Sequence, residues 1–350
     1  MSSEAPVSAP SRVPVAPWLR DPPFDLTFIG ATAAWAIGAG AAVVLNPQLF
    51  LPILALDVWL LGYQHVVATF TRLVFDSESL RAHRALVIEL PVIVAVCTIA
   101  VAWLVGPWII ATLYLYWQWF HYTRQSFGVS RMYLRKAQRT LPANDVATFG
   151  VIYLLPLWGI LRRSHQHPAR FLGLDIVCLP VPTPVLYVSA ALALASVVLW
   201  VAREARLWSL GQQNSPYACY VLSHMAVFTA GYLLIDDINT GWLVLNIWHN
   251  AQYVLVVWMY NSNRFRRGVD PGHRFLSTIS QQNNIALYFA VCVGLATVLY
   301  LSIQQGLSIF AGKVMGASLT AYMIINFHHY VVDAIVWRSR RSAASQRVAA

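Results

Sequence analysis

Charge is the property that this sequence has least of. Asp, Glu, Lys and Arg together make up 11% of its 350 residues, whereas a soluble globular domain carries roughly 25%. Hydrophobic residues make up 58%, and the mean hydropathy is +0.56. A chain of this composition is not expected to fold as a water-soluble globular domain. It predicts a polytopic membrane protein in which long apolar helices cross the lipid bilayer.

Cysteine pairs and cofactor motifs are also missing. The four cysteines, Cys97, Cys178, Cys219 and Cys292, are widely separated and form no CxxC pair. We therefore expect neither a disulfide framework nor a thiolate metal site. No nucleotide-binding or flavin-binding motif is present. A monooxygenase reaction would then need an electron-donor protein as a partner, whereas a dioxygenase reaction would not.

Basic residues outnumber acidic ones, but they do not form one patch. The net charge is +10 at pH 7, and the Lys and Arg residues fall in short segments between apolar runs. This distribution speaks against nucleic acid as a partner. It indicates instead contact with lipid headgroups and a fixed orientation in the bilayer.

The apolar runs predict an all-α fold, a polytopic transmembrane helix bundle of about ten spans. Each run is close to the roughly 20 residues that a helix needs to cross the hydrocarbon of a bilayer. The predicted spans are residues 26–46, 51–73, 85–105, 108–128, 146–162, 183–203, 216–235, 241–261, 285–305 and 314–337. The chain then divides into a Pro-, Ala- and Ser-rich disordered tail at 1–24, a transmembrane helical domain at 25–337 and a basic tail at 338–350.

Loop charges predict the orientation of the bundle. Basic residues such as Arg72 and Arg203 follow the even-numbered spans, and the opposite ends carry few of them. Since cytoplasmic loops are the ones enriched in Lys and Arg, both termini are expected in the cytoplasm and the protein in the inner membrane of the cell. One loop disagrees, because residues 162–170 place three arginines on the outer side. Either the fifth span is re-entrant or this loop is an exception.

Histidines inside the predicted spans are the main functional signal. An ionisable group in hydrocarbon costs a few kcal/mol unless it is paired or ligated. Five of them lie on spans two, four, eight and ten, which all run in one direction, so at ~1.5 Å per residue they reach similar depths. These are His65, His121, His249, His328 and His329. We predict that they are the ligands of a shared metal site in the bundle core. His224 has no polar companion at helical spacing and is interpreted as a hydrogen-bond partner between helices.

Polar residues accompany these histidines at helical spacing. Asp333 follows His329 by four residues, and Tyr253 follows His249 by four, so each pair shares a helix face. Asp333 could be a ligand or could fix the imidazole tautomer from behind. We predict Asp333 and Tyr253 as catalytic groups. Asp57 precedes His65 by eight residues, about two turns.

Aromatic and basic residues near the histidines are candidates for substrate binding. Trp117 and Trp248 lie deep in their spans and either line a cavity for a long apolar or polyene substrate or pack in the core. Arg72 and Arg124 lie near predicted cytoplasmic ends. Their guanidinium groups either extend to the lipid headgroups or hold the polar end of a substrate.

The histidine layout resembles that of one enzyme family. Trp248-His249 on a late helix, His121 followed by an aromatic residue, and His65 on an early helix look like the Brp/Blh-type membrane carotenoid dioxygenases. The resemblance implies iron held by membrane histidines and cleavage of beta-carotene to retinal. The chain departs from that family at Gly62-Tyr63-Gln64-His65, where an early His-Gly and Asp-His signature is expected. The HxxxH and HxxHH boxes of membrane desaturases are absent.

These features together predict a membrane metal-dependent oxygenase or related redox enzyme acting on a hydrophobic small molecule, a lipid, isoprenoid or carotenoid. Imidazole ligands suit Fe, Zn or Cu, and non-haem iron is preferred because oxidation of a hydrocarbon requires a redox metal. Two alternatives stay open. A bis-histidine haem protein for electron transfer would use two of the same residues, and a proton-coupled transporter would use His and Asp as a relay.

Overall fold

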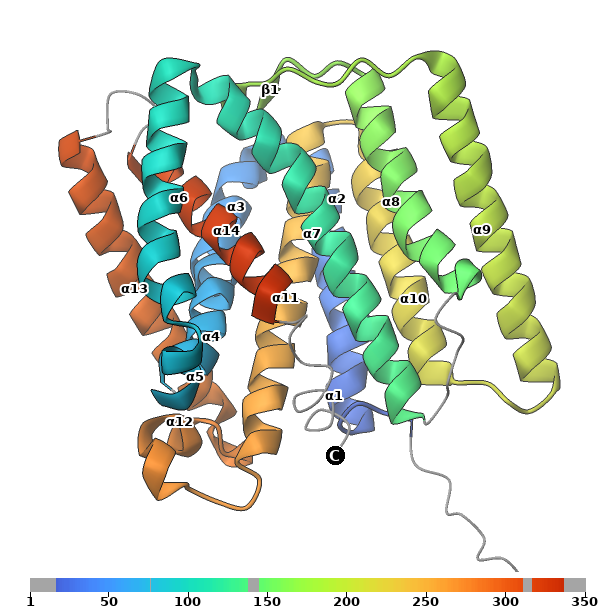
Figure 1. The fold of residues 1–350 in the computed structure, drawn as a ribbon. Helices are drawn as coiled ribbons and strands as arrows, with labels where there is room; N and C mark the ends of the chain where they lie inside the picture. Colours follow the sequence, from blue (N-terminus) through green and yellow to red (C-terminus); the bar gives the residue numbers. More distant parts are fainter. Residues whose placement is uncertain (1–16, 76, 138–144, 311–316, 337–350) are drawn as a thin grey trace, which may run out of the picture.

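The described residues form a helix bundle with one short β hairpin (Figure 1). The computed structural model describes residues 17–75, 77–137, 145–310 and 317–336. The hairpin pairs β1 (Arg170–Phe171) with β2 (Leu174–Asp175) in antiparallel register. The all-α prediction is therefore confirmed for the part of the chain that the structure describes.

The predicted spans coincide with long helices. In chain order these are α1 (Pro22–Leu26) with the π-helical η1 (Thr27–Ala31) and α2 (Thr32–Leu45); α3 (Phe50–Asp57), the π-helical η3 (Val58–Gly62) and α4 (Tyr63–Leu73); α6 (Arg84–Leu104); α7 (Pro107–Lys136); α8 (Val146–His165); α9 (Thr183–Ser209); α10 (Ser215–Phe228) with the π-helical η4 (Thr229–Leu234); α11 (Ile238–Arg264); α13 (Ile285–Phe310); and α14 (Ala317–Val336). The short helices α5 (Ser77–Ala82) and α12 (Arg274–Ile279) lie between them.

Seven of these helical segments, among the described residues, are long and apolar enough to cross a membrane. The chain is thus a multi-pass membrane protein. The helices α7, α11 and α14 are not among the seven. They carry His121, His249 and His329, and polar residues of this kind lower the mean hydropathy of a helix.

The helix α11 lies at the centre of the bundle. Most of its side chains are buried, including both its apolar and its polar residues. It packs against α2, α4, α10 and η4, and Figure 1 shows it passing behind α14 and α7. Small residues allow the closest approach, since a Cβ atom added to Gly231 would lie 2.7 Å from the carbonyl oxygen of Gly241. Close backbone packing of this kind is typical of helices in membranes.

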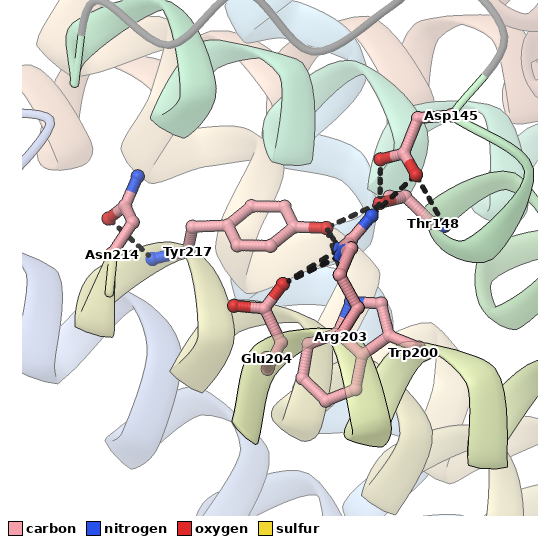
Figure 2. Close-up of polar contacts among 7 residues, drawn as sticks. All are labelled: Asp145, Thr148, Trp200, Arg203, Glu204, Asn214 and Tyr217. Atoms are coloured by element: carbon pink, nitrogen blue, oxygen red, sulfur yellow. Dashed lines mark hydrogen bonds and ion pairs between the residues drawn. The ribbon is translucent and has the colours of Figure 1, made fainter. Parts of the chain in front are cut away.

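A cluster of polar side chains ties α8, α9 and α10 together at one end of the bundle (Figure 2). Arg203 donates to Asp145 Oδ1 at 2.5 Å, to Glu204 Oε1 at 2.8 Å and to the Tyr217 hydroxyl at 2.9 Å. Thr148 is hydrogen-bonded to both Asp145 and Tyr217. The charges in this cluster are paired and its hydroxyl groups are hydrogen-bonded. Its role is therefore structural, to link the three helices.

The arginine-rich loop that conflicts with the predicted orientation follows a single continuous helix, α8. Arg163 is 1% exposed and donates to the backbone carbonyls of Gly231, Ile235 and Asp236. Arg162 bonds the Asp236 side chain at 3.4 Å. Both guanidinium groups are therefore bound at the end of η4.

The packed part of the chain begins earlier than the predicted boundary at residue 25. Leu19 is 2% exposed, and its backbone N–H donates to Asp25 Oδ1. The Tyr133 hydroxyl donates to the same carboxylate at 2.6 Å. The guanidinium of Arg20 lies 4.3 Å from the ring centroid of Trp258. Residues 1–16 and the predicted basic tail at 338–350 lie outside the described residues.

Candidate metal centre

Four histidines from four different helices meet in the core. His65 lies on α4, His121 on α7, His249 on α11 and His329 on α14, and each is at most 8% exposed. Their ring centroids are 4.5 Å apart for His65 and His329, 4.9 Å for His121 and His249, 5.0 Å for His121 and His329, and 5.4 Å for His65 and His249. We call these four residues the histidine cluster.

Two sets of side chains in this region have the spacing of metal ligands. His65, His249 and His329 form one set, and the other combines His121 and His329 with Asp333. Within each set the ligand atoms lie within 4.8 Å of one another. Two ligands bound at about 2.1 Å from one ion would be about 3.0 to 4.2 Å apart for angles of 90° to 180°. Small side-chain adjustments would therefore suffice to bring either set onto an ion.

Several ring nitrogens of the cluster have no hydrogen-bond partner among the described residues. They include both ring nitrogens of His249 and the Nε2 atom of His121, and both of these side chains are buried. Buried polar atoms in proteins are normally hydrogen-bonded. His249 and His121 each belong to a set whose ligand atoms lie within 4.8 Å of one another, so their unpartnered nitrogens fit a metal ion.

His329 is the residue that both sets share. Its Nε2 lies 3.0 Å from Nε2 of His65 and 3.5 Å from Oδ2 of Asp333. On the other side of the ring, Nδ1 lies 3.3 Å from the Thr69 hydroxyl. A hydroxyl that accepts from Nδ1 would leave the Nε2 lone pair free for a metal, as partners of ligating histidines commonly do.

The Asp333 carboxylate is held by a second helix. The Tyr253 hydroxyl on α11 donates to Asp333 Oδ1 at 2.8 Å. The same hydroxyl is hydrogen-bonded to Thr69 at 2.7 Å. Three helices are thereby joined at one point, and Asp333 and His329 keep a fixed relative position. The structure thus places both residues that were predicted as catalytic beside the histidine cluster.

A second buried carboxylate is bonded to two asparagines that lie on either side of His249 in the sequence of α11. Asp57 is 2% exposed and accepts from Asn246 at 2.5 Å and Asn250 at 3.4 Å. The Tyr122 hydroxyl donates to the Asn246 side-chain oxygen at 2.6 Å, and the Tyr122 ring lies 4.2 Å from that of His249. The π-helical η3 separates Asp57 from His65. π-Helical turns of this kind are frequent at functional sites.

Three of the predicted site residues lie elsewhere. His328 Nε2 is 2.8 Å from the backbone oxygen of Leu86, and its ring stacks on Phe70, so it faces α6 and not the cluster. Trp248 packs against α10 and is 1% exposed. Arg124 is exposed, with its guanidinium 6.0 Å from the Phe120 centroid.

The other predicted binding residues are a tryptophan at the edge of the cluster and an arginine. Trp117 is 39% exposed and packs on Tyr330, whose ring in turn stacks on His121 at 4.4 Å. The side chain of Arg72 lies outside what the structure describes. His224 is fully buried with its ring 4.4 Å from that of Phe228, and neither of its ring nitrogens has a hydrogen-bond partner among the described residues, so the predicted hydrogen bond between helices is not seen.

Sequence reasoning missed three residues that contact the cluster, namely Thr69, Tyr122 and Tyr330. Thr69 follows His65 by four residues, so the spacing rule that singled out Asp333 could have found it. Tyr330 directly follows His329, and no periodic pattern marks a neighbour in sequence as a contact across helices. Tyr122 directly follows His121 in the same way.

Fold and site together define the class of the protein, a multi-pass helical membrane protein with a buried cluster of histidines and a carboxylate. No protein-family model, no curated protein and no solved structure matches the chain.

Proposed function

We propose that the chain is a membrane-embedded metal-dependent oxygenase, or a related redox enzyme, that acts on a lipid, isoprenoid or carotenoid. The observation that carries this proposal is the convergence of four buried imidazoles and one carboxylate from four helices. Imidazole and carboxylate ligands suit Fe, Zn and Cu, and oxidation of an unactivated hydrocarbon requires a redox metal. Non-haem iron is therefore the proposed metal.

The ligand set supports this choice of metal. His121, His329 and Asp333 supply two imidazoles and one carboxylate, the combination typical of non-haem iron oxygenases with open coordination positions. His65 and His249 lie close enough to replace or add to them. When bound, the metal would supply the activation of dioxygen.

The chain's own residues would prepare the site for that chemistry. Tyr253 and Thr69 hold Asp333 and His329 in place through hydrogen bonds of 2.7 to 3.3 Å. Burial of the cluster keeps bulk water away, which protects reactive species from side reactions. A dioxygenase reaction needs nothing further, whereas a monooxygenase reaction would draw electrons from a partner protein.

Haem is a poorer fit than a single ion for the closest pair of histidines. Nε2 of His65 and Nε2 of His329 are 3.0 Å apart. Axial histidines of a haem must lie on opposite faces of the macrocycle, and this distance leaves no space for it between the two rings. A visible spectrum of the purified protein tests the point, because a Soret band would favour haem over the proposed iron site.

Metal analysis of purified variants tests the proposal. We expect about one iron per chain in the wild type and less than a tenth of that in His329→Ala, because His329 belongs to both ligand sets. His328→Ala is the matched control, since it removes the adjacent imidazole on the same helix, which contacts Leu86 instead. Equal metal contents in all three proteins would contradict the proposal.

Product analysis tests the reaction itself. Iron-loaded protein in lipid vesicles would be incubated with beta-carotene under ¹⁸O₂, and the products examined by mass spectrometry. We expect ¹⁸O-labelled cleavage products from the wild type and none from His329→Ala. If the protein binds metal but no product contains ¹⁸O, the oxygenase proposal is contradicted and the metal site is still supported.

A further inference from the structure

A groove opens on the outer surface of the bundle close to the histidine cluster. Its walls come from α2, from η3 with the start of α4, and from α13, and its volume is about 680 Å³. Sites for small molecules commonly have volumes of about 300 to 1,000 Å³. In Figure 1, α13 lies at the outer edge of the bundle.

The groove is lined by residues of three segments that are long and apolar enough to cross a membrane. Trp35 and Trp59 line it and are 52% and 48% exposed. Both belong to segments that are long and apolar enough to cross a membrane, as does α13. A molecule that reaches this groove would therefore come from within the bilayer.

Gln64 is the polar anchor of the groove. This residue is among those that line the groove and is 1% exposed, and its amide nitrogen has no hydrogen-bond partner among the described residues. A buried donor without a partner costs about 1 to 3 kcal/mol. The groove has two indole N–H donors besides this amide: Nε1 of Trp59 is already bonded to Thr297 at 2.9 Å, and Trp35 is 52% exposed. The free amide thus calls for a ligand with a hydrogen-bond-accepting oxygen.

Charge narrows the choice of ligand further. Every residue that lines the groove is uncharged. A phosphate or carboxylate would find no cation here, and a quaternary ammonium would find no anion. An uncharged chain with one hydroxyl or carbonyl oxygen matches both the apolar walls and the buried donor of Gln64.

The groove also lies next to the candidate metal centre. Gln64 directly precedes His65 on α4, and successive residues of a helix point about 100° apart. The two side chains therefore lie on adjoining sides of the same helix turn, one lining the groove and one in the histidine cluster.

We propose that this groove binds an uncharged isoprenoid or fatty chain from the bilayer, with its oxygen accepting a hydrogen bond from Gln64. That the bound molecule is the substrate rests on the proposed function, whereas the binding does not. An alkyne-tagged diazirine derivative of geranylgeraniol serves as the probe. It would be photo-crosslinked to the full-length protein in lipid nanodiscs, and the labelled peptides identified by mass spectrometry.

Glycines on α13 provide a variant and its matched control. Gly294 lines the groove, and a Cβ atom added there meets nothing within 4 Å, so the ring of Gly294→Phe is expected to occupy the groove. Gly306 lies on the same helix outside the groove and is equally open. We expect labelling of residues 289–298 to fall at least tenfold in Gly294→Phe and to stay unchanged in Gly306→Phe.

The polar anchor is tested by comparing two probes. Gln64→Leu is expected to weaken binding of the alcohol about 3- to 10-fold, the loss of one hydrogen bond, and to leave binding of the matching hydrocarbon unchanged. Excess geranylgeraniol should compete with the probe, and excess phosphatidylcholine should not. Equal labelling in Gly294→Phe, or equal competition by the phospholipid, would overturn the proposal.

Metal content measured in the same samples separates the two proposals. If labelling depends on Gly294 and Gln64 but the protein contains no metal, the groove proposal is supported and the proposed metal-dependent function is contradicted. Bound iron together with labelling that is unchanged in Gly294→Phe and Gln64→Leu would support the metal site and contradict the groove proposal.

Discussion

The hydroxyl of Tyr253 gives the sharpest test of how the site is held. It donates to Asp333 Oδ1 at 2.8 Å and is bonded to Thr69 at 2.7 Å. Tyr253→Phe removes this hydroxyl and keeps the ring, which lies 5.3 Å from the rings of both His65 and His329. The substitution therefore loosens Asp333 without removing a ligand.

The size of the effect follows from the bonds that are lost. A hydrogen bond to a charged group contributes about 1.5 to 3 kcal/mol. Loss of a partner behind a metal ligand typically weakens metal binding about 10- to 100-fold, and each tenfold change corresponds to about 1.4 kcal/mol. The two ranges agree, so we expect Tyr253→Phe to raise the iron Kd by 10- to 100-fold.

Competition with a chelator of known affinity would measure this Kd in the purified protein. Tyr300→Phe is the control, because the Tyr300 hydroxyl is buried without a hydrogen-bond partner among the described residues. Its Kd should match that of the wild type. A wild-type Kd in Tyr253→Phe would refute the view that the Tyr253 hydroxyl positions Asp333 for the metal.

Three further outcomes are expected. Removal of metal with a chelator should lower the Tm of the wild type but not of His329→Ala, since an ion at 100 times its Kd stabilises the fold by about 2.7 kcal/mol. Arg163→Met should destabilise the protein by about 3 kcal/mol or more in thermal unfolding, because three backbone carbonyls lose a charged donor. Gly241→Ala should destabilise it by about 1 to 3 kcal/mol, because the new methyl group would overlap the backbone of Gly231. Gly38→Ala, where a Cβ atom meets nothing within 4 Å, is the control and should unfold at the wild-type temperature.

The positions of the helices could be predicted because hydropathy and length decide them directly. Each predicted span has a helix, including α11, where His249 interrupts the apolar pattern. The number of helices that cross the membrane could not be predicted in the same way. In α7, α11 and α14 the polar residues lower the hydropathy, and only packing against other helices explains why such residues are buried.

For the histidine cluster, sequence patterns predict the depth of each residue in the bundle but not the direction in which its side chain points. Similar depth on four co-directional helices led to His65, His121, His249 and His329, and the structure brings their rings together. The rotation of each helix about its axis is not encoded in such a pattern. For this reason His328 was not distinguished from its neighbour, although it faces Leu86.

The same limit applies to the contacts between helices. Of the two roles predicted for Trp248, the structure shows core packing, because α10 lies on that side of α11. Thr69 reaches His329 only because α4 and α14 are neighbours in the bundle. Contacts of this kind depend on which helices lie side by side, and one sequence does not contain that information.

X-ray absorption spectroscopy at the iron edge tests the central claim most directly. The purified, iron-loaded protein should show nitrogen and oxygen ligands at about 2.0 to 2.2 Å, in the range of imidazole and carboxylate ligation, with the multiple scattering that imidazole rings produce. His329→Ala should lose part of that imidazole signal. A spectrum of iron surrounded by water oxygens alone, unchanged in His329→Ala, would contradict the assignment of the histidine cluster as a metal site.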